Sequence, residues 1–466
     1  MQISNKDLRL YIIMLLVFLC LILTTFILPL QQDEGVFLTI AEGLKNGLLP
    51  YRDFFDHKPP GIYFIFGILS LATKNIFFYK FLLITSHLVS LLLIFLISQK
   101  IKISGHYTIL FYLCLILIFE GQRMIAEPFG VLFLLLSLYV NLSAKKLTSA
   151  LLTGFLLGVS ILIKQTFLLS AFAFLVYFIW QKKHKKLPWI ITGTLIPIIV
   201  TILWLWASNI LPIAYEQIIL YNFKFYPSEN IVKVIRLLTP SFLYTLPIWL
   251  LSGFAAIRLL RRPPNQMTIR NFNKVDNSLL AIWQIRHPLV LIALLATLPI
   301  FLFFGRHYPH YWLQVAPFFA IIASATMNKV SPSTRVFTTI FLIIFCIIFT
   351  TVNVKGNYSR HVAEKNLSVF LRRQNTAIYA ENQFTGMYFL TGNQPPNKYL
   401  YITEISDWSE QAEEKTIETI KDDDYLVIWP ADSNYAYAKK LQSYVLNNYK
   451  PVYWDGDLGV VAYKTK

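Results

Sequence analysis

Two short stretches near the N-terminus combine residue types that suit proton transfer and phosphate binding. The first is QQDEG, in which Asp33 and Glu34 directly follow a long apolar run. The second is DHKPPG, where Pro59 and Pro60 fix the backbone and push Lys58 into an extended conformation. A carboxylate can accept a proton from a hydroxyl or an amine, and a lysine can neutralise a phosphate. The two stretches therefore predict a site at which a proton is removed and negative charge is stabilised.

The elements that position these groups are predicted to be membrane spans. The chain has 466 residues, of which 56% are hydrophobic and only 14% are charged, whereas a soluble domain has about 25% charged residues. Apolar blocks of the length that crosses about 30 Å of hydrocarbon recur along it. We place eleven spans at about 10–30, 79–99, 106–119, 128–143, 149–163, 165–180, 188–207, 240–257, 288–304, 312–327 and 334–353. The first block lacks a cleavage pattern and is read as a retained span.

The distribution of charge predicts the orientation of these spans. The net charge is +17, but residues 1–354 hold 29 Lys+Arg against 11 Asp+Glu, and residues 355–466 hold 13 against 14. With a cytoplasmic N-terminus, every predicted cytoplasmic loop is basic, as the positive-inside rule requires. The positive charge therefore indicates topology in the plasma (inner) membrane, and we expect no nucleic acid partner. The acids predicted on the opposite side are Asp33, Glu34, Glu42, Asp53, Asp56, Glu120, Glu127, Glu216 and Glu229.

Two domains are expected, with 1–354 forming the membrane domain and 355–466 an extracytoplasmic domain. In the first outer loop, the helical spacing at 36–44 and the short apolar run at 61–73 predict two helices that lie at the membrane interface. In the C-terminal part, strands are predicted at 377–380, 399–403, 425–429 and 460–463, with helices near 361–373, 410–421 and 433–447. The fold class is thus mainly α, with a small C-terminal α/β domain.

The carboxylates and the lysine of the first loop each have a simpler interpretation. A free carboxylate at the hydrocarbon edge is costly, which indicates a role for Asp33 and Glu34, but these residues also mark the water boundary. Asp56 or His57 suits a metal ion or a phosphate oxygen, whereas Lys58 suits either a lipid phosphate or a headgroup anchor. Further polar side chains are predicted on the same side at Glu120, Arg123, Glu127, Lys164, Arg306, His307 and His310. Their collection on one side, with carboxylates among them, favours a site.

In its motifs and their order the sequence resembles a family of membrane enzymes. DE at the end of the first span, an amphipathic helix and KPP follow one another as in the polyprenyl-phosphate-sugar-dependent glycosyltransferases of the GT-C fold. Further motifs are similar to the protein O-mannosyltransferase and lipid A aminoarabinose transferase group, bacterial families 39 and 83. They are AEPFGVLF with Glu127, GFLLGVSILIKQ with Lys164, GRHYPHYWLQVAPFFA, and MYFLTGNQPPNKYLYI. The chain departs from this pattern at Gly35, where some members have arginine, at His57, where the aminoarabinose transferase has glutamate, and at Glu127, where many have aspartate.

The resemblance implies transfer of a sugar from a polyprenyl phosphate to an extracytoplasmic acceptor, which is a lipid, a glycan or a protein, with inversion. Such a reaction needs a base near the acceptor, and we assign that role to Asp33. It also needs positive charge where the phosphate departs. Lys58, Arg306, His310 and Lys164 are the candidates for that charge.

A divalent cation is a further candidate for stabilising the phosphate. Glu34 and Glu127 are oxygen donors of the kind that Mg²⁺ or Mn²⁺ prefers, and participation of His57 would favour Mn²⁺ or Zn²⁺. Asp56 is another candidate of the first loop. The three cysteines lie inside apolar blocks, so they indicate neither a disulfide framework nor a CxxC metal site.

Two other functions remain open from the sequence alone. Eleven spans would suit a transporter or flippase of lipid-linked saccharides, but transporters place ionisable groups or broken helices at the bilayer midplane. Here the predicted span centres are free of charge and the ionisable residues lie on one side. A polymerase or ligase of lipid-linked glycans is the second alternative, although its extended outer loop lies late in the chain.

Overall fold

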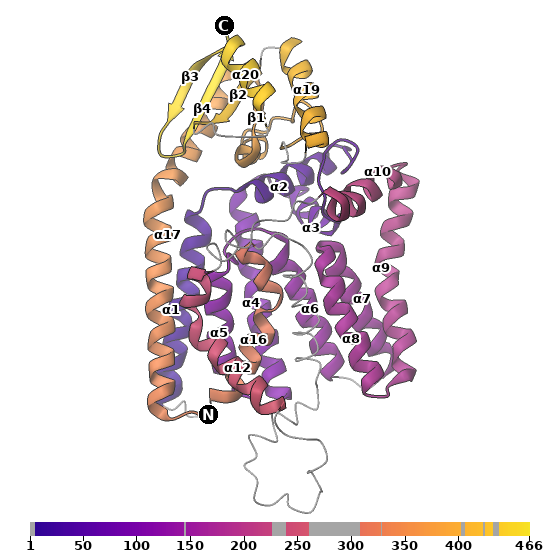
Figure 1. The fold of residues 1–466 in the computed structure, drawn as a ribbon, viewed down its shortest axis with the longest axis vertical. Helices are drawn as coiled ribbons and strands as arrows, with labels where there is room; N and C mark the ends of the chain where they lie inside the picture. Colours follow the sequence, from indigo (N-terminus) through magenta and orange to yellow (C-terminus); the bar gives the residue numbers. More distant parts are fainter. Residues whose placement is uncertain are drawn as a thin grey trace, which may run out of the picture.

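The apolar blocks of the sequence form the helices of one bundle, shown in Figure 1. A computed structural model describes residues 5–143, 146–225, 239–260, 308–327, 329–401, 406–422, 425–431 and 438–466. The helices that match predicted spans are α1 (Asn5–Ile27), α4 (Ile76–Lys100), α5 (Gly105–Ile118), α6 (Ala126–Ser143), α7 (Leu147–Ile163), α8 (Leu168–Trp180), α9 (Leu187–Ala207), α12 (Leu246–Leu260), α16 (Ala316–Met327) and α17 (Pro332–Gln374). The predicted span at 288–304 lies outside the described residues.

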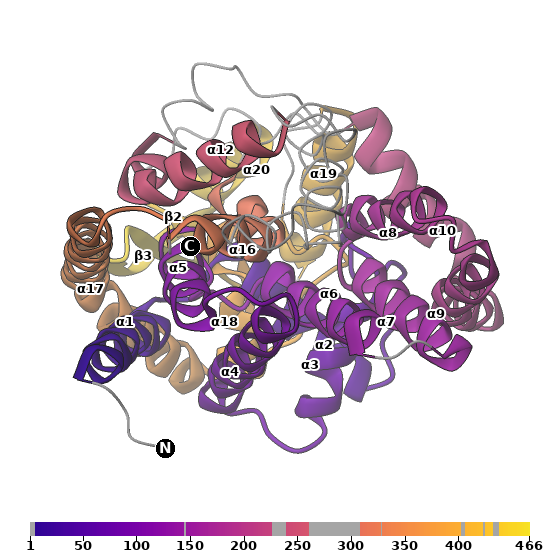
Figure 2. The same ribbon diagram turned by 90° about the horizontal axis from the view of Figure 1, so that it is seen from below.

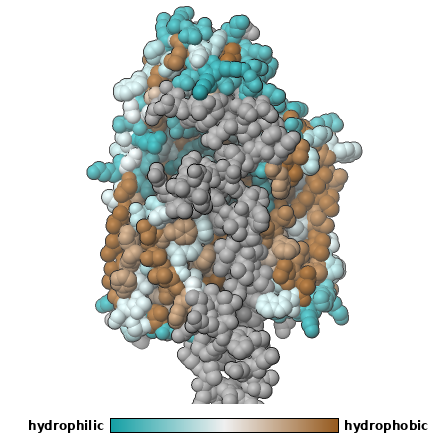
Figure 3. Space-filling view, viewed as in Figure 1, coloured by the Kyte–Doolittle hydropathy of each residue, from teal (hydrophilic) through white to brown (hydrophobic). Residues whose placement is uncertain are grey.

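The surface of the bundle is the surface of a multi-pass membrane protein. Figure 3 shows apolar residues covering the sides of the bundle, with polar residues over the C-terminal sheet region and at the opposite end. Large apolar side chains face outward on α9, where Trp206 is 68% exposed and Val200 is 60% exposed. Such a surface is unfavourable in water but matches hydrocarbon. Among the described helices, α1, α4, α6, α9 and α17 are long enough to cross the membrane, so the number of eleven spans stays a prediction.

The longest helix links the bundle to the C-terminal sheet region. At 43 residues, α17 is about 65 Å long, roughly twice the hydrocarbon thickness. Its predicted span, 334–353, runs beside α1, and its remaining part rises beyond the bundle (Figures 1 and 2). The expected domain boundary at residue 354 therefore falls inside a continuous helix, and the division into two domains stays a prediction.

Both helices expected in the first loop are present, as α2 (Gln32–Lys45) and α3 (Gly61–Ser70). The residues from Glu34 to Gly43 are all buried, because α3 packs on one side of α2 and α18 (Gly386–Thr391) packs on the other. The amphipathic pattern of α2 indicated a helix with one solvated face. In the fold this face is covered by the C-terminal region instead.

The C-terminal region contains a four-stranded sheet with the order β1-β2-β4-β3. The strands are β1 (Ala377–Ala380), β2 (Tyr425–Pro430), β3 (Tyr449–Asp455) and β4 (Val460–Thr465), and α19 (Ser406–Asp422) and α20 (Lys439–Asn448) accompany them. β1 pairs with β2 in parallel, whereas β4 is antiparallel to both β2 and β3.

The sheet confirms three of the predicted strands and corrects a fourth. The strand predicted from Tyr399 is wrong over residues 399–401, which have no strand partner, while residues 402–403 lie outside the described part. The rings of Tyr399 and Tyr401 pack against Phe55 of the first loop instead. β3 was not predicted from the sequence, since Pro451 and a lysine interrupt its apolar pattern, as is common in edge strands.

Candidate active site

Asp33 lies in the first turn of α2, at the end of the bundle that carries the sheet region. The helix starts after Gln31, whose backbone N–H donates to Oε2 of Glu34 at 2.8 Å, as in a capping box. A carboxylate in the first turn of a helix is stabilised by the helix dipole. Asp33 is therefore placed where its ionised form is favoured, and its side chain keeps 36% exposure.

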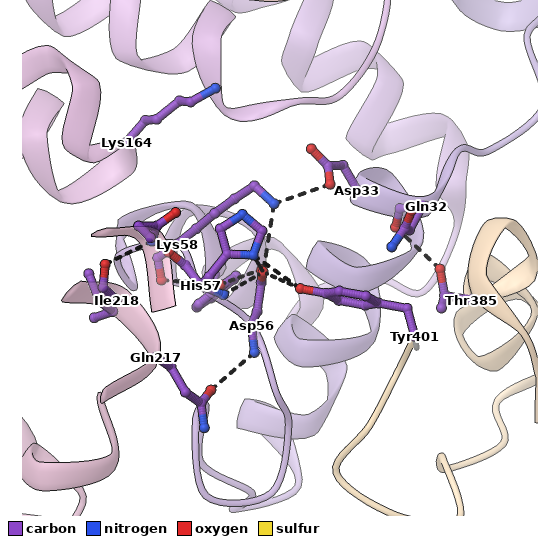
Figure 4. Close-up of polar contacts among 12 residues, drawn as sticks. Gln32, Asp33, Asp56, His57, Lys58, Lys164, Gln217, Ile218, Thr385 and Tyr401 are labelled. Carbon is purple, nitrogen blue, oxygen red and sulfur yellow. Dashed lines mark hydrogen bonds and ion pairs between the residues drawn. The ribbon is translucent and has the colours of Figure 1, made fainter. Parts of the chain in front are cut away.

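Lys58 lies between two carboxylates, as Figure 4 shows. Its Nζ is 3.1 Å from Oδ1 of Asp33 and 3.6 Å from Oδ1 of Asp56, and it stands 5.0 Å from the ring centroid of Phe37. Both prolines of the KPP turn precede α3, and Lys58 just before them reaches Asp33 in the first turn of α2. The structure thus brings together three of the predicted residues.

The two carboxylates differ in what they are free to do. Asp56 is 1% exposed, and its oxygens accept hydrogen bonds from the hydroxyls of Tyr63 at 2.6 Å and Tyr401 at 3.1 Å and from the backbone N–H of His57 at 2.7 Å. A buried carboxylate with these partners holds Lys58 in place and is shielded from small molecules in solution. Asp33 is the more accessible of the two carboxylates.

The charges around Asp33 determine the pKa of its carboxyl group. Burial alone would raise the pKa of Asp33, but Lys58 above all, with smaller effects of His310 and His57, lowers that pKa to about 2. Asp33 is consequently ionised at neutral pH.

A π-helix at Glu216–Phe225 (η3) holds the DHKPPG turn from the side opposite α2. Gln217 accepts a hydrogen bond from the backbone N–H of Asp56 at 3.2 Å, and Asn222 donates to the carbonyl of His57 at 2.8 Å. The ring of Tyr221 stacks on His57, with centroids 5.2 Å apart. π-Helices are rare and concentrate at functional sites. The sequence does not predict this contact, because nothing in EQIILYNF indicates a partner for a turn about 160 residues earlier.

Lys164 approaches the same place from the end of α7, where the backbone is extended. It is buried, forms an ion pair with Glu127 of α6, and its ammonium lies 3.9 Å from the ring centroid of Tyr311. In Figure 4 its Nζ points toward Asp33 and Lys58. The site therefore contains two buried lysines that reach it from different elements.

Gly61 allows the KPP turn to lie against the end of α7. A Cβ atom at this position would lie 2.5 Å from the carbonyl oxygen of Leu162, two residues before Lys164. We expect Gly61→Ala to push the turn away from α7 and to lower the activity of the site roughly tenfold or more, since small displacements at a reacting site cost up to about 10²-fold. The effect is measured as kcat per folded protein in membranes. Gly67→Ala, whose added methyl would meet only a leucine side chain at 3.4 Å, is the control and should retain activity.

His310 completes this side of the site. Its Nδ1 is 2.8 Å from Oε2 of Glu120, and its Nε2 is 3.8 Å from Oε1 of Glu127. Burial would raise the pKa of Glu120, but the hydrogen bond and charge of His310 lower it. The short helix Pro309–Gln314 (η6) carries His310. Arg306, which was predicted to join it at the phosphate, lies outside the described residues and stays a prediction.

The residues predicted to bind a cation are not gathered into one group. Glu34 accepts a hydrogen bond from the backbone N–H of Met124 at 2.8 Å and lies 3.3 Å from Arg123, so it faces away from Asp33. Glu127 is paired with Lys164. Within the described part of the chain, no three His, Cys, Asp or Glu side chains are grouped to hold a metal ion. The two glutamates thus fit a resident cation poorly, and the cation itself stays a prediction.

Tyr401 is a site residue that sequence analysis did not single out. It comes from the C-terminal region, and its hydroxyl lies 3.1 Å from Oδ1 of Asp56 and 3.2 Å from Nδ1 of His57. In the sequence, Tyr401 is distinguished only by its place in MYFLTGNQPPNKYLYI, one of the motifs that resemble the glycosyltransferase family.

We expect Tyr401→Phe to lower the activity of the site about 3- to 10-fold, because a hydrogen bond of this kind contributes about 0.5–1.5 kcal/mol. The loss would be seen in steady-state assays, with expression and melting unchanged. Tyr399→Phe, at a ring that packs on Phe55 with centroids 6.1 Å apart, is the matched control. Equal losses in the two variants would contradict a role for the Tyr401 hydroxyl.

Comparison with known proteins adds two findings to this geometry. Residues 56–206 match the family model described as dolichyl-phosphate-mannose-protein mannosyltransferase. This segment begins at Asp56 and includes the KPP turn, Glu127 and Lys164, and it is about a third of the chain. The comparison with curated proteins gives no match.

Two crystal structures of ArnT from Cupriavidus metallidurans have the same fold. The structure bound to undecaprenyl phosphate has a TM-score of 0.67 at 11% identity, and the apo structure has 0.68 at 12%. In each case the match covers 99% of this chain and 98% of the other. The expected fold, a helical membrane bundle of GT-C type with a small C-terminal sheet region, is confirmed, and so is the resemblance to the O-mannosyltransferase and aminoarabinose transferase group.

Proposed function

We propose that this protein is a membrane glycosyltransferase that moves a sugar from a polyprenyl phosphate to an acceptor at the sheet end of the bundle. The observation that carries the proposal is Lys58, a buried cation that Asp56 holds beside the more accessible carboxylate of Asp33. A base next to a phosphate-binding cation is what this reaction requires. The match to the mannosyltransferase family model and the fold shared with ArnT, which was solved with undecaprenyl phosphate, support it.

The proposed step is a direct displacement. An acceptor oxygen or nitrogen forms a bond to the anomeric carbon while the bond from that carbon to the phosphate oxygen breaks. The acceptor proton passes to Asp33, and the electron pair leaves with the polyprenyl phosphate. Lys58 neutralises the charge that develops on the phosphate. Lys164 and His310, which both lie beside Glu127, are the further candidates for this role. Attack from the face opposite the phosphate inverts the anomeric centre.

The pairing of Asp33 with Lys58 has a consequence for the order of events. A carboxylate with a pKa of about 2 is a weak base, because proton transfer works best when the pKa lies near the working pH. A donor phosphate that accepts hydrogen bonds from Lys58 competes with Asp33 for that ammonium and adds negative charge nearby. Donor binding therefore raises the pKa of Asp33 and makes it a better base before the acceptor reacts.

The same proposal places the site outside the cytoplasm, in the plasma (inner) membrane. Exposed basic residues gather in the connections at the end of the bundle opposite the sheet region, at 100–102 and 182–186. The positive-inside rule supports a cytoplasmic location for these connections and an extracytoplasmic location for Asp33 and the sheet region. The acceptor would be a lipid, a glycan or a protein of the cell envelope.

The proposal is tested by supplying radiolabelled polyprenyl phosphate sugars to membranes that contain the protein and identifying what becomes labelled. We expect label to pass from the lipid phosphate to an acceptor with inverted anomeric configuration, and only in membranes with the wild-type protein. Movement of intact labelled lipid across the membrane without sugar transfer would overturn the proposal and favour a flippase.

A further inference from the structure

The segment that joins α1 to α2 is fixed by charged side chains from three other parts of the chain. We call residues 28–30 the elbow. Nζ of Lys80 lies 2.9 Å from the carbonyl oxygen of Leu28, Nη1 of Arg123 lies 3.2 Å from that of Pro29, and Oε1 of Glu364 accepts from the backbone N–H of Leu30 at 2.9 Å. Three consecutive residues of the elbow thus each have a charged partner.

These charged groups are buried. Lys80 is 6% exposed, Arg123 is 8% and Glu364 is 9%. Buried charges are costly unless they are paired. Glu34, 3.3 Å from Arg123, supplies the second carboxyl group, so the charges of two cations are balanced when Glu364 is ionised. Such an arrangement fixes the elbow more firmly than neutral hydrogen bonds would, because charge-assisted bonds are about twice as strong.

The elbow determines where Asp33 lies. Leu30 is only three residues before Asp33, and α2 begins directly after Gln31. Lys58 is held separately, by Asp56 and the π-helix that contacts its turn. The separation of 3.1 Å between Asp33 and Lys58 therefore depends on the elbow as well as on the packing of α2 against α3.

We propose that Glu364 is a positioning residue for Asp33, through which the C-terminal region sets the geometry of the site. Glu364 belongs to the part of α17 that lies beyond its predicted span and continues to Gln374, three residues before β1 begins. The helix that carries the sheet region thus also holds the backbone N–H of Leu30. The inference rests on the proposed function only in taking Asp33 as the base.

The ionisation of Glu364 gives this role a pH dependence. Burial raises the pKa of Glu364 to about 7, although the hydrogen bond from Leu30 and the charge of Lys80 oppose that shift. The other charged groups that face it are Glu34 and Arg123, and His361, one turn earlier on α17, faces Lys80. Glu364 is ionised above about pH 7 and holds the elbow most firmly there.

The first test compares Glu364→Gln with Glu413→Gln in membranes. Glu413 is a matched control because it is also a buried acid that accepts from a backbone N–H, that of Leu441 at 2.8 Å, but within the sheet region. For Glu364→Gln we expect kcat per folded protein to fall roughly 10- to 100-fold, with KM for the donor unchanged and the rise of kcat through about pH 7 abolished. Glu413→Gln should keep all three properties, and a wild-type profile for Glu364→Gln would overturn the inference.

The second test needs no transferase activity. In a background that lacks the three native cysteines, the thiol introduced by Asp33→Cys is labelled with a water-soluble maleimide, with and without Glu364→Gln. We expect the labelling rate to change at least threefold with Glu364→Gln and to stay constant with Glu413→Gln. If Glu364→Gln does not fold, Glu364→Asp replaces it: the shorter carboxylate should lower kcat and change the labelling rate, while the rise of kcat with pH remains. If Glu364→Gln changes the labelling rate but the wild type transfers no sugar, only the proposed function is refuted. If the labelling rate does not change, the positioning role of Glu364 is refuted.

Discussion

Replacing Asp33 with Asn is expected to lower the rate of sugar transfer by roughly 10²–10⁴-fold, which is the usual contribution of a general base. The amide keeps the shape of the side chain and still contacts Lys58, but it cannot accept the proton of the acceptor. Donor binding should persist, because Asp56 still holds Lys58 at 3.6 Å. The measurement is single-turnover transfer from a radiolabelled polyprenyl phosphate sugar, with donor binding followed separately.

The control for this variant is Asp53→Asn in the same loop. Asp53 is paired at the surface with Arg52, 2.7 Å away, and has no contact with Lys58 among those described, so transfer should stay within about twofold of the wild type. The pKa of Asp33 in the folded protein is about 2, below its ordinary value of 3.8. Its ionised form therefore stabilises the fold above about pH 4, and this contribution is lost as the pH falls toward 2. Full transfer by Asp33→Asn would remove Asp33 as the base.

Most of the helical architecture could be predicted from the sequence because lipid requires uninterrupted apolar runs with satisfied backbone groups. The number of spans could not, since α5 with 14 residues and α16 with 12 are shorter than a typical crossing helix. Local composition also gave a wrong prediction at Tyr399: the residues there are typical of a strand, but the ring of Tyr399 packs on Phe55 of the first loop instead. In that case tertiary contact decides the conformation, and local propensity does not.

The part of the candidate site that comes from a single loop could be predicted from the sequence. Asp33 and Lys58 belong to one loop, so their proximity follows from two short helices and a proline-fixed turn. Tyr401, Gln217 and Glu364 reach the site or the elbow only through the tertiary fold, and each has a polar side chain of an ordinary kind. No local pattern in the sequence distinguishes such residues from other polar residues near a membrane surface.

The different roles of Asp33 and Glu34 are another feature that the sequence motif does not predict. The sequence motif DE presents Asp33 and Glu34 as a pair, but neighbouring residues of an α-helix point about 100° apart. Asp33 therefore faces Lys58, whereas Glu34 faces Arg123 and the backbone of Met124. One carboxylate is available for chemistry and the other belongs to the cluster that fixes the elbow.

The charge of Lys58 is the second feature on which transfer should depend strongly. It is the cation nearest to Asp33 in the described part of the chain, and its side chain is 8% exposed, with the ammonium between two carboxylates. Positive charge held in advance at the point where a phosphate departs usually contributes 10²–10³-fold to the rate. Burial raises the pKa of Asp33, and the charge of Lys58 is the main effect that lowers it.

Lys58→Met is therefore expected to lower kcat/KM for the donor by roughly 10²–10³-fold and to move the pKa of Asp33 upward from about 2. On acidification, the residual activity and the stability of the protein should both fall at a higher pH than in the wild type. The two shifts should agree, because both follow the ionisation of Asp33. Initial rates and melting temperatures between pH 3 and 8 measure the two shifts. Lys74→Met, at a surface lysine paired with Glu42 at 2.6 Å, is the matched control. If Lys58→Met weakened the donor reaction without either of these shifts, the pairing of Lys58 with Asp33 would not operate in the working enzyme.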